Sequence, residues 1–244
     1  MINFNQEKRD TTPLAGQVAE RISEMIKSKN LIVGERLPNE FELAEQLNVG
    51  RGTIREAVKL LVARNILVIE RGKGTFVRQM PGMSEDPLGL TFMGGQAELA
   101  YDLLQVRLQI EPWCASMAAE NITEEQADAL RKQYENLSNV TNLDISDQER
   151  RERYIEEDIK LHTLIGEASG NRVVPRLIPV ICTGVDLFSK MSRERPQARY
   201  IAMDTHKQVV KCIVNHQAGP AKEAMRNHLL QNMESIKKYL GNKE

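Results

Sequence analysis

The first eighty residues contain three helical patterns followed by two extended runs, and this order constrains the fold more than any other feature. Apolar residues recur at helical spacing in three segments: 14–26, 40–47 and 51–63. Two β-rich runs follow and flank a glycine-rich turn: 67–71 and 75–78, with Gly72-Lys73-Gly74 between them. Helix, helix-turn-helix and hairpin is the order of a winged helix-turn-helix, so we expect residues 1–78 to form such a domain.

The charge of this region favours a nucleic-acid interface. Residues 48–80 carry seven Lys or Arg and two Asp or Glu, whereas the whole chain has a net charge of -1. The third helix of a winged helix-turn-helix enters the major groove, and the hairpin lies along the backbone or minor groove. We therefore assign DNA contacts to the start of that helix and to the hairpin tip: Arg51, Gly52, Thr53, Arg55, Arg71, Gly72 and Lys73. A helical hairpin with solvated arginines is the alternative.

The rest of the chain predicts a second, all-helical domain. Residues 79–96 are rich in Pro, Gly and Met, which is typical of a linker. Six helical patterns follow: 97–119, 123–140, 147–169, 172–193, 199–217 and 220–240. The predicted fold class is therefore mostly α, with a winged helix-turn-helix and small β-hairpin followed by an all-α bundle over residues 97–244.

Four ionisable residues fall on the apolar stripes of these helices. Asp158 and His162 lie one turn apart in EDIKLH, and His206 and His228 lie on the stripes of two later helices. A buried carboxylate is costly unless it is paired, and one shared metal ion would satisfy all four ligands. This ligand set suits a divalent transition metal, with zinc as the first candidate and nickel, manganese or iron open. A hydrogen-bonded polar network without metal is the alternative.

Arg107 also lies on an apolar stripe, together with Leu103, Leu104 and Ile110. An inward-facing arginine needs an anion. Either the carboxylate of a bound ligand or Glu111, one helical turn further on, meets that need.

The segment LPNEFELAEQLNVGRGTIREAVKLLVARNILVIERGKGTFV resembles the DNA-binding domain of GntR-type bacterial transcription regulators, and the resemblance spans nearly all of residues 10–78. The family often has arginine as the fifth residue of its LPxER segment, and that arginine helps to contact DNA. Phe41 takes this position here. We therefore expect an operator that differs from the commonest one in the family.

The second domain resembles the ligand-sensing FCD domain of the FadR subfamily. Its pattern comprises R-x3-E, D-x3-H before SGN, and one histidine in each of the last two long helices: Arg107, Glu111, Asp158, His162, Asn171, His206 and His228. In the metal-binding branch the Asp and three His hold a divalent metal whose open positions help to bind a small carboxylate effector. The resemblance implies that role here, with Arg107 and Asn171 as effector contacts. A local helix cap is the alternative for Asn171.

These features together predict a ligand-responsive DNA-binding regulator, a repressor in most of the family, rather than an enzyme. We expect a homodimer on an inverted-repeat operator, with a sugar acid or hydroxy acid as effector. A metal sensor without an organic effector and a metalloenzyme fused to a DNA-binding domain are the alternatives. Three scattered cysteines, no signal-peptide core and no apolar run of membrane-spanning length predict a cytoplasmic protein with no membrane contact.

Overall fold

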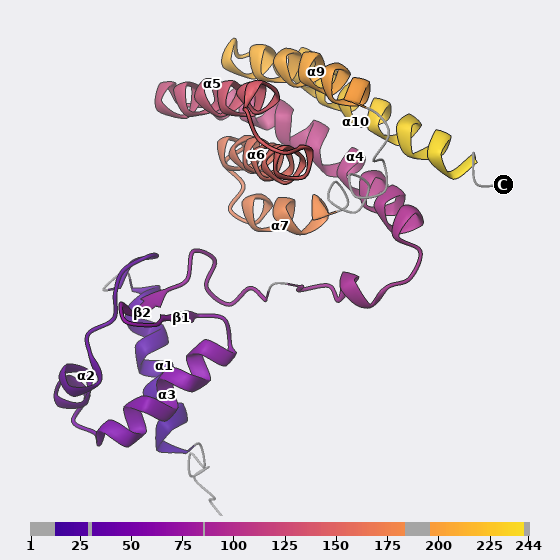
Figure 1. The fold of residues 1–244 in the computed structure, drawn as a ribbon. Coiled ribbons are helices and arrows are strands. Elements are labelled where there is room, and N and C mark those ends of the chain that lie inside the picture. Colours follow the sequence, from indigo (N-terminus) through magenta and orange to yellow (C-terminus); the bar gives the residue numbers. More distant parts are fainter. Residues whose placement is uncertain (1–12, 29–30, 85, 184–195, 242–244) are drawn as a thin grey trace, which may run out of the picture. The chain divides into compact units, whose positions relative to one another are not determined.

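The computed structural model describes residues 13–28, 31–84, 86–183 and 196–241. The chain divides into two compact units, Met1–Pro87 and Leu88–Glu244 (Figure 1). Each unit has its own hydrophobic core. The first unit contains a two-stranded antiparallel sheet, and the described residues of the second form helices and connecting loops without a strand. This architecture confirms the predicted fold class.

The first unit is a winged helix-turn-helix. It consists of α1 (Leu14–Lys27), α2 (Glu40–Leu47), α3 (Arg51–Ala63), β1 (Leu67–Glu70) and β2 (Gly74–Val77). Both α1 and α2 pack on α3, and the two strands pair in register from Leu67 opposite Val77 to Glu70 opposite Gly74. The core that joins these elements includes Ile22, Leu43, Ile54, Leu61 and Leu67, each less than 2% exposed. Burial of these apolar side chains fixes α3 against the other elements.

Local sequence chemistry sets the turn between α2 and α3. The side chain of Asn39 accepts hydrogen bonds from the backbone of the first turn of α2, and the carboxylate of Glu42 accepts one from the backbone N–H of Asn39, so a capping box starts this helix. Asn48 ends the helix with a left-handed backbone, at a φ of 52°, which asparagine adopts more readily than most residues. Gly50 then forms the N-cap of α3. The short turn positions the start of α3 at the surface of the unit.

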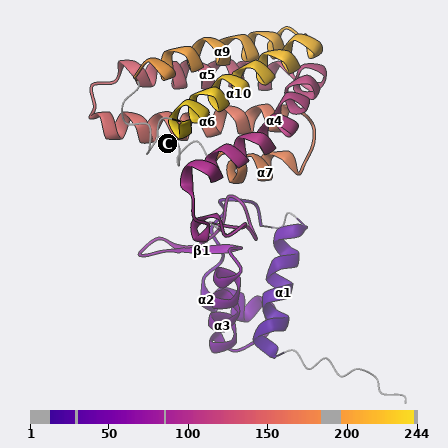
Figure 2. The same ribbon diagram turned by 90° about the vertical axis from the view of Figure 1, so that its right-hand side faces the viewer.

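The second unit is a helical bundle. It contains η1 (Leu90–Phe92), α4 (Gln96–Asn121), α5 (Glu124–Asn139), η2 (Val140–Asn142), α6 (Asp147–Ala168), α7 (Val174–Ile181), α9 (Pro196–Val214) and α10 (Ala218–Gly241). Figure 2 shows α10 lying along α4 and α9, while α6 packs against α4, α5 and α7. Capping boxes at Thr123 and Ser146 begin α5 and α6. Four long helices, α4, α6, α9 and α10, carry all residues of the predicted metal and effector site except Asn171, which lies between α6 and α7.

One predicted helix differs from the structure. The pattern over 172–193 indicated a single helix, but α7 begins at Val174 and ends at Ile181, with Cys182 as its C-cap. Residues 184–193 of that prediction lie outside the described residues. Within the described part of the chain, no helix combines the length and apolar character needed to cross a membrane.

Candidate DNA-binding face and metal centre

The start of α3 presents polar and small residues on an exposed surface. Arg51, Gly52 and Arg55 are exposed, and Thr53 is half-buried. A Cβ atom added at Gly52 would have no neighbour within 4 Å, so this surface is open. The guanidinium of Arg55 forms two hydrogen bonds with Glu40 of α2, from Nε to Oε1 at 3.1 Å and from Nη2 to Oε2 at 2.7 Å.

The hairpin tip carries the other predicted DNA contacts. Gly72 has a φ of 79°, a left-handed conformation that glycine adopts without steric cost. The flanking side chains of Arg71 and Lys73 are exposed, and Lys73 forms an ion pair with Glu70 at 3.0 Å. Phe41, at the position where the family often has arginine, is 63% exposed on α2. An exposed phenylalanine adds nothing to the core of this unit.

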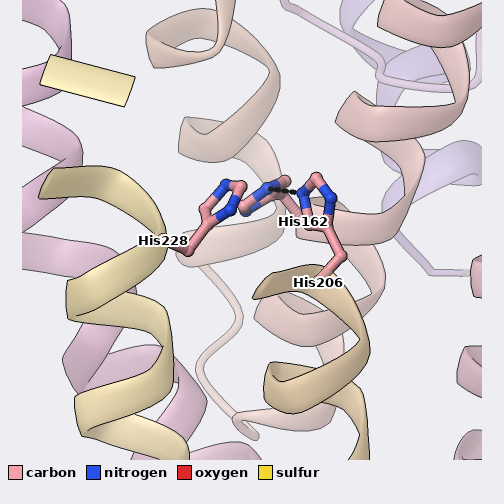
Figure 3. Close-up of side chains that lie close together, drawn as sticks. All are labelled: His162, His206 and His228. Atoms are coloured by element: carbon pink, nitrogen blue, oxygen red, sulfur yellow. Dashed lines mark hydrogen bonds between the residues drawn. The ribbon is translucent and has the colours of Figure 1, made fainter. Parts of the chain in front are cut away.

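The second unit brings the predicted metal ligands together. Asp158 and His162 come from α6, His206 from α9 and His228 from α10, and each is at most 4% exposed. Figure 3 shows the three imidazoles converging from their separate helices. One nitrogen from each of the three rings lies within 4.8 Å of the others.

The contacts inside this cluster are short. Nε2 of His206 lies 3.0 Å from Oδ1 of Asp158 and 3.3 Å from Nε2 of His162, and Oδ1 of Asp158 lies 3.9 Å from Nε2 of His162. The ring of His228 is centred 4.1 Å from that of His206. Buried Nδ1 of His206 has no hydrogen-bond partner among the described residues.

Burial and charge shift the pKa values of this cluster in opposite directions. Burial lowers the pKa of His206, although the hydrogen bond with Asp158 offsets part of that effect, and burial lowers the pKa of His228 well below its usual value. Burial alone would raise the pKa of Asp158, but its interactions with His162 and His206 outweigh burial and hold the pKa below its usual range. The cluster therefore favours neutral imidazoles at His206 and His228 beside an ionised carboxylate, which are the protonation states of metal ligands.

Arg107 and Glu111 of α4 border the cluster. Both side chains are buried, and Nε of Arg107 donates a hydrogen bond to Oε1 of Glu111. Burial alone would raise the pKa of Glu111, but its interactions with Arg107 and His162 together outweigh burial and hold the pKa at about 2. Nη2 of Arg107 lies 3.4 Å from Nε2 of His162, while Nη1 is buried and has no hydrogen-bond partner among the described residues. Glu111 thus satisfies one part of the guanidinium and leaves another without an acceptor.

Asn171 occupies a different kind of position. Its Oδ1 accepts hydrogen bonds from the backbone N–H groups of Val173 and Val174, at 2.9 Å and 3.3 Å, where α7 begins. This geometry is the local cap that was the alternative interpretation of Asn171. We therefore leave this residue out of the candidate effector site.

Four further polar residues at the cluster were not among the predicted site residues, and one of them is Asn232, whose Nδ2 lies 3.3 Å from Nε2 of His228. Oε2 of Glu111 lies 2.6 Å from Nδ1 of His162, and Oγ1 of Thr205 lies 2.8 Å from Nδ1 of His228. Sγ of buried Cys182 lies 3.9 Å from Oε1 of Glu111. Glu111 had a sequence signal in its position on the stripe of Arg107, and Thr205 directly precedes His206, but Cys182 had none.

A winged helix-turn-helix followed by a helical domain with a buried polar centre is the arrangement of a transcription regulator. The family model for bacterial regulatory proteins of the gntR family matches residues 14–77, and the model for the FCD domain matches residues 102–231. The chain belongs to the GntR family of bacterial transcription regulators, in the FadR-like group that carries an FCD domain.

Similarity to individual proteins supports this family assignment. The "Putative L-lactate dehydrogenase operon regulatory protein" of Escherichia coli (strain K12) is 32% identical over 225 residues, which cover 88% of this chain and 83% of the relative. The "HTH-type transcriptional repressor NanR" of Enterobacter sp. (strain 638) is 28% identical over 233 residues, covering 88% and 82%. The solved structure of Streptococcus agalactiae GntR is 32% identical, with a TM-score of 0.71 and coverage of 91% and 99%. These domains and relatives are regulators, which confirms the prediction that the chain is not an enzyme.

Proposed function

We propose that this chain is an effector-responsive repressor. In this proposal Asp158, His162, His206 and His228 hold a divalent transition metal ion, with zinc as the first candidate, and a small hydroxy acid or sugar acid binds beside it. The observation that carries the proposal is the convergence of these four buried side chains from α6, α9 and α10. The chain would act in the cytoplasm, where bacterial operators lie.

The distances between the side chains support a metal site. Ligand atoms held at about 2.0–2.1 Å by one tetrahedral ion stand about 3.3 Å from each other. The three separations among Oδ1 of Asp158, Nε2 of His162 and Nε2 of His206 are 3.0, 3.3 and 3.9 Å, which bracket that value. Burial of His206 and His228 adds to the fit, because it favours the neutral imidazole that binds metal.

The buried charges support a carboxylate effector. With neutral imidazoles, Arg107, Asp158 and Glu111 give the centre a net charge of minus one, and a divalent ion would make it plus one. A single carboxylate would neutralise that charge and would give Nη1 of Arg107 the acceptor that it lacks. Nη2 of Arg107 lies 3.4 Å from Nε2 of His162, a proposed ligand atom, so the guanidinium and the metal ion would repel each other. An effector carboxylate between them would reduce this repulsion. The name of the lactate-operon relative agrees with a hydroxy acid, since lactate is one.

The first unit would provide the operator contacts. In this proposal Arg51, Gly52, Thr53 and Arg55 of α3 enter the major groove, and Arg71, Gly72 and Lys73 at the hairpin tip reach the neighbouring phosphates. A homodimer would place two copies of α3 on an inverted repeat. Effector binding would shift the population between arrangements that differ in operator affinity, with a coupling of roughly 1–3 kcal/mol.

Thermal unfolding and operator binding with matched ligands test this function. The full-length protein is stripped with a chelator, and part of it is reloaded with zinc. L-Lactate, other hydroxy acids and sugar acids, and propane-1,2-diol, which has the carbon chain of lactate without the carboxylate, are then added to both preparations. We expect L-lactate or another hydroxy or sugar acid to stabilise only the reloaded protein and to change its operator affinity. If zinc alone changes operator affinity and no acid does, the protein is a metal sensor and the effector proposal is wrong.

A further inference from the structure

The ion pair between Glu40 and Arg55 joins the two helices of the helix-turn-helix. Both side chains are exposed, at 43% and 60%, so the pair lies on the surface. An exposed ion pair adds little to folding stability, because water screens the attraction and the two side chains lose rotational freedom. The two hydrogen bonds between Arg55 and Glu40 therefore suggest a role for the pair other than folding stability.

The geometry of the pair determines which part of Arg55 remains available. A guanidinium can present its side, with Nε and Nη2, or its end, with Nη1 and Nη2. The carboxylate of Glu40 binds the side of Arg55, since the two bonds start from Nε and Nη2. The end stays open, and no hydrogen bond among the described residues involves its Nη1 atom.

The open end matches the major-groove edge of guanine. O6 and N7 of guanine are two acceptors that an arginine binds with two parallel N–H groups. Arg55 lies on the second turn of α3, the helix that enters the groove in this fold. A free arginine side chain must lose rotamer freedom to make such a contact, whereas one held by a carboxylate has lost much of it before DNA arrives.

We propose that Glu40 is a specificity-determining residue that holds Arg55 in position, so that the open end of the guanidinium reads a guanine in each half of the operator. This inference rests on the proposed contact between Arg55 and DNA. A cation that contacts phosphate raises affinity for DNA of any sequence. The negative charge of Glu40 has the opposite effect and lowers that general affinity. Glu40 therefore lowers the affinity for unrelated DNA and increases the discrimination between bases.

The test uses the full-length protein and an operator selected from random duplexes. Each guanine of that operator is replaced in turn by 7-deazaguanine, which pairs normally with cytosine but lacks N7. For the wild-type protein we expect one guanine in each half-site at which this change weakens binding by about 5- to 100-fold. Glu40→Gln should reduce that penalty by at least about threefold and should raise affinity for unrelated DNA.

Two further variants separate charge from geometry. Glu40→Asp keeps the charge but is one methylene too short to hold both nitrogens, so it should lose discrimination as Glu40→Gln does. Glu45→Gln makes the same charge change at another exposed position of α2 and should keep the wild-type penalty. Circular dichroism and thermal unfolding confirm that each variant is folded, which the exposure of these side chains leads us to expect.

The outcomes distinguish the role of Glu40 from the proposed contact between Arg55 and the major groove. If Arg55→Ala binds the operator as the wild type does, the assignment of Arg55 to the groove is wrong. If Arg55→Ala loses binding but Glu40→Gln and Glu40→Asp keep the full 7-deazaguanine penalty, only the role of Glu40 is overturned. The role of Glu40 is also overturned if 7-deazaguanine weakens binding at no guanine of the operator.

Discussion

Glu111 and His162 are held together across the interface of α4 and α6, with Oε2 of the carboxylate 2.6 Å from Nδ1 of the imidazole. A carboxylate in this position accepts a hydrogen bond from Nδ1–H and leaves Nε2 as the atom with a free lone pair. Nε2 of His162 is the atom that faces Asp158 and His206. The contact thus selects the tautomer that the proposed metal site requires.

Replacement of Glu111 by Gln is expected to weaken metal binding by about 10- to 100-fold, because carboxylates that orient metal-binding histidines have effects of this size. Competition with a metal-binding dye measures the change. Glu157→Gln is a matched control, since Glu157 is also buried but binds Gln133 and Lys160 instead of a histidine. Equal metal affinity in Glu111→Gln and the wild type would exclude this role for Glu111.

Arg107→Lys should separate effector binding from metal binding. Lysine retains the positive charge beside Glu111, but it lacks the planar fork that binds two carboxylates at once. We expect the variant to keep its metal and to bind the acid effector at least about tenfold more weakly. Calorimetric titration of the zinc-loaded protein gives both values, and an unchanged effector affinity would remove Arg107 from the effector site.

The metal-free protein is expected to lose stability as the pH falls from 7.5 to 5.5. Burial lowers the pKa of His206 and of His228 from 6.5, so below about 6.5 the unfolded chain binds protons that the folded chain does not. Each histidine can contribute a loss of up to about 1.4 kcal/mol per pH unit in this window. Urea unfolding of chelator-treated protein measures the slope, and His228→Asn should reduce it. A free energy of unfolding that stays constant over this range would contradict the buried, neutral state of these imidazoles.

Phe41→Arg is expected to strengthen DNA binding and to change the preferred operator. Phe41 is exposed on α2, so the substitution removes little packing and adds a cation at a position where the family often contacts DNA. One added phosphate contact would steepen the dependence of log affinity on log salt by about 0.9. Fluorescence anisotropy at several salt concentrations measures the slope, with Phe41→Gln as the uncharged control. Identical slopes for both variants would mean that this position does not approach DNA.

The first unit was predictable because its signals are local. Capping residues, the turn at Asn48 and the hairpin glycines each act within a few residues, and the structure follows them closely: the predicted helix 40–47 is α2, and the predicted helix 51–63 is α3. The pattern over 172–193 missed the end of α7 at Ile181, because apolar residues continue in the sequence beyond the C-cap Cys182. Apolar spacing alone does not detect the end of a helix.

The buried centre was predictable in part. A charged or imidazole side chain on an apolar stripe must face the core, so Arg107, Asp158 and the three histidines could be placed inward from spacing alone. Contacts between helices had no such signal, because the pairing of Glu111 with His162 depends on how α4 packs against α6. The same holds for the bond between Arg55 and Glu40, which are 15 residues apart on two helices.

Elemental analysis of the purified full-length protein tests the central claim most directly. We expect about one transition metal ion per chain in the wild type and in His216→Ala, whose histidine lies outside the cluster, and a large loss in His206→Ala. Wild-type protein that contains no metal even after zinc or nickel is added back would contradict the account. So would full metal occupancy in His206→Ala, and Asp158 and the three histidines would then be a buried polar network.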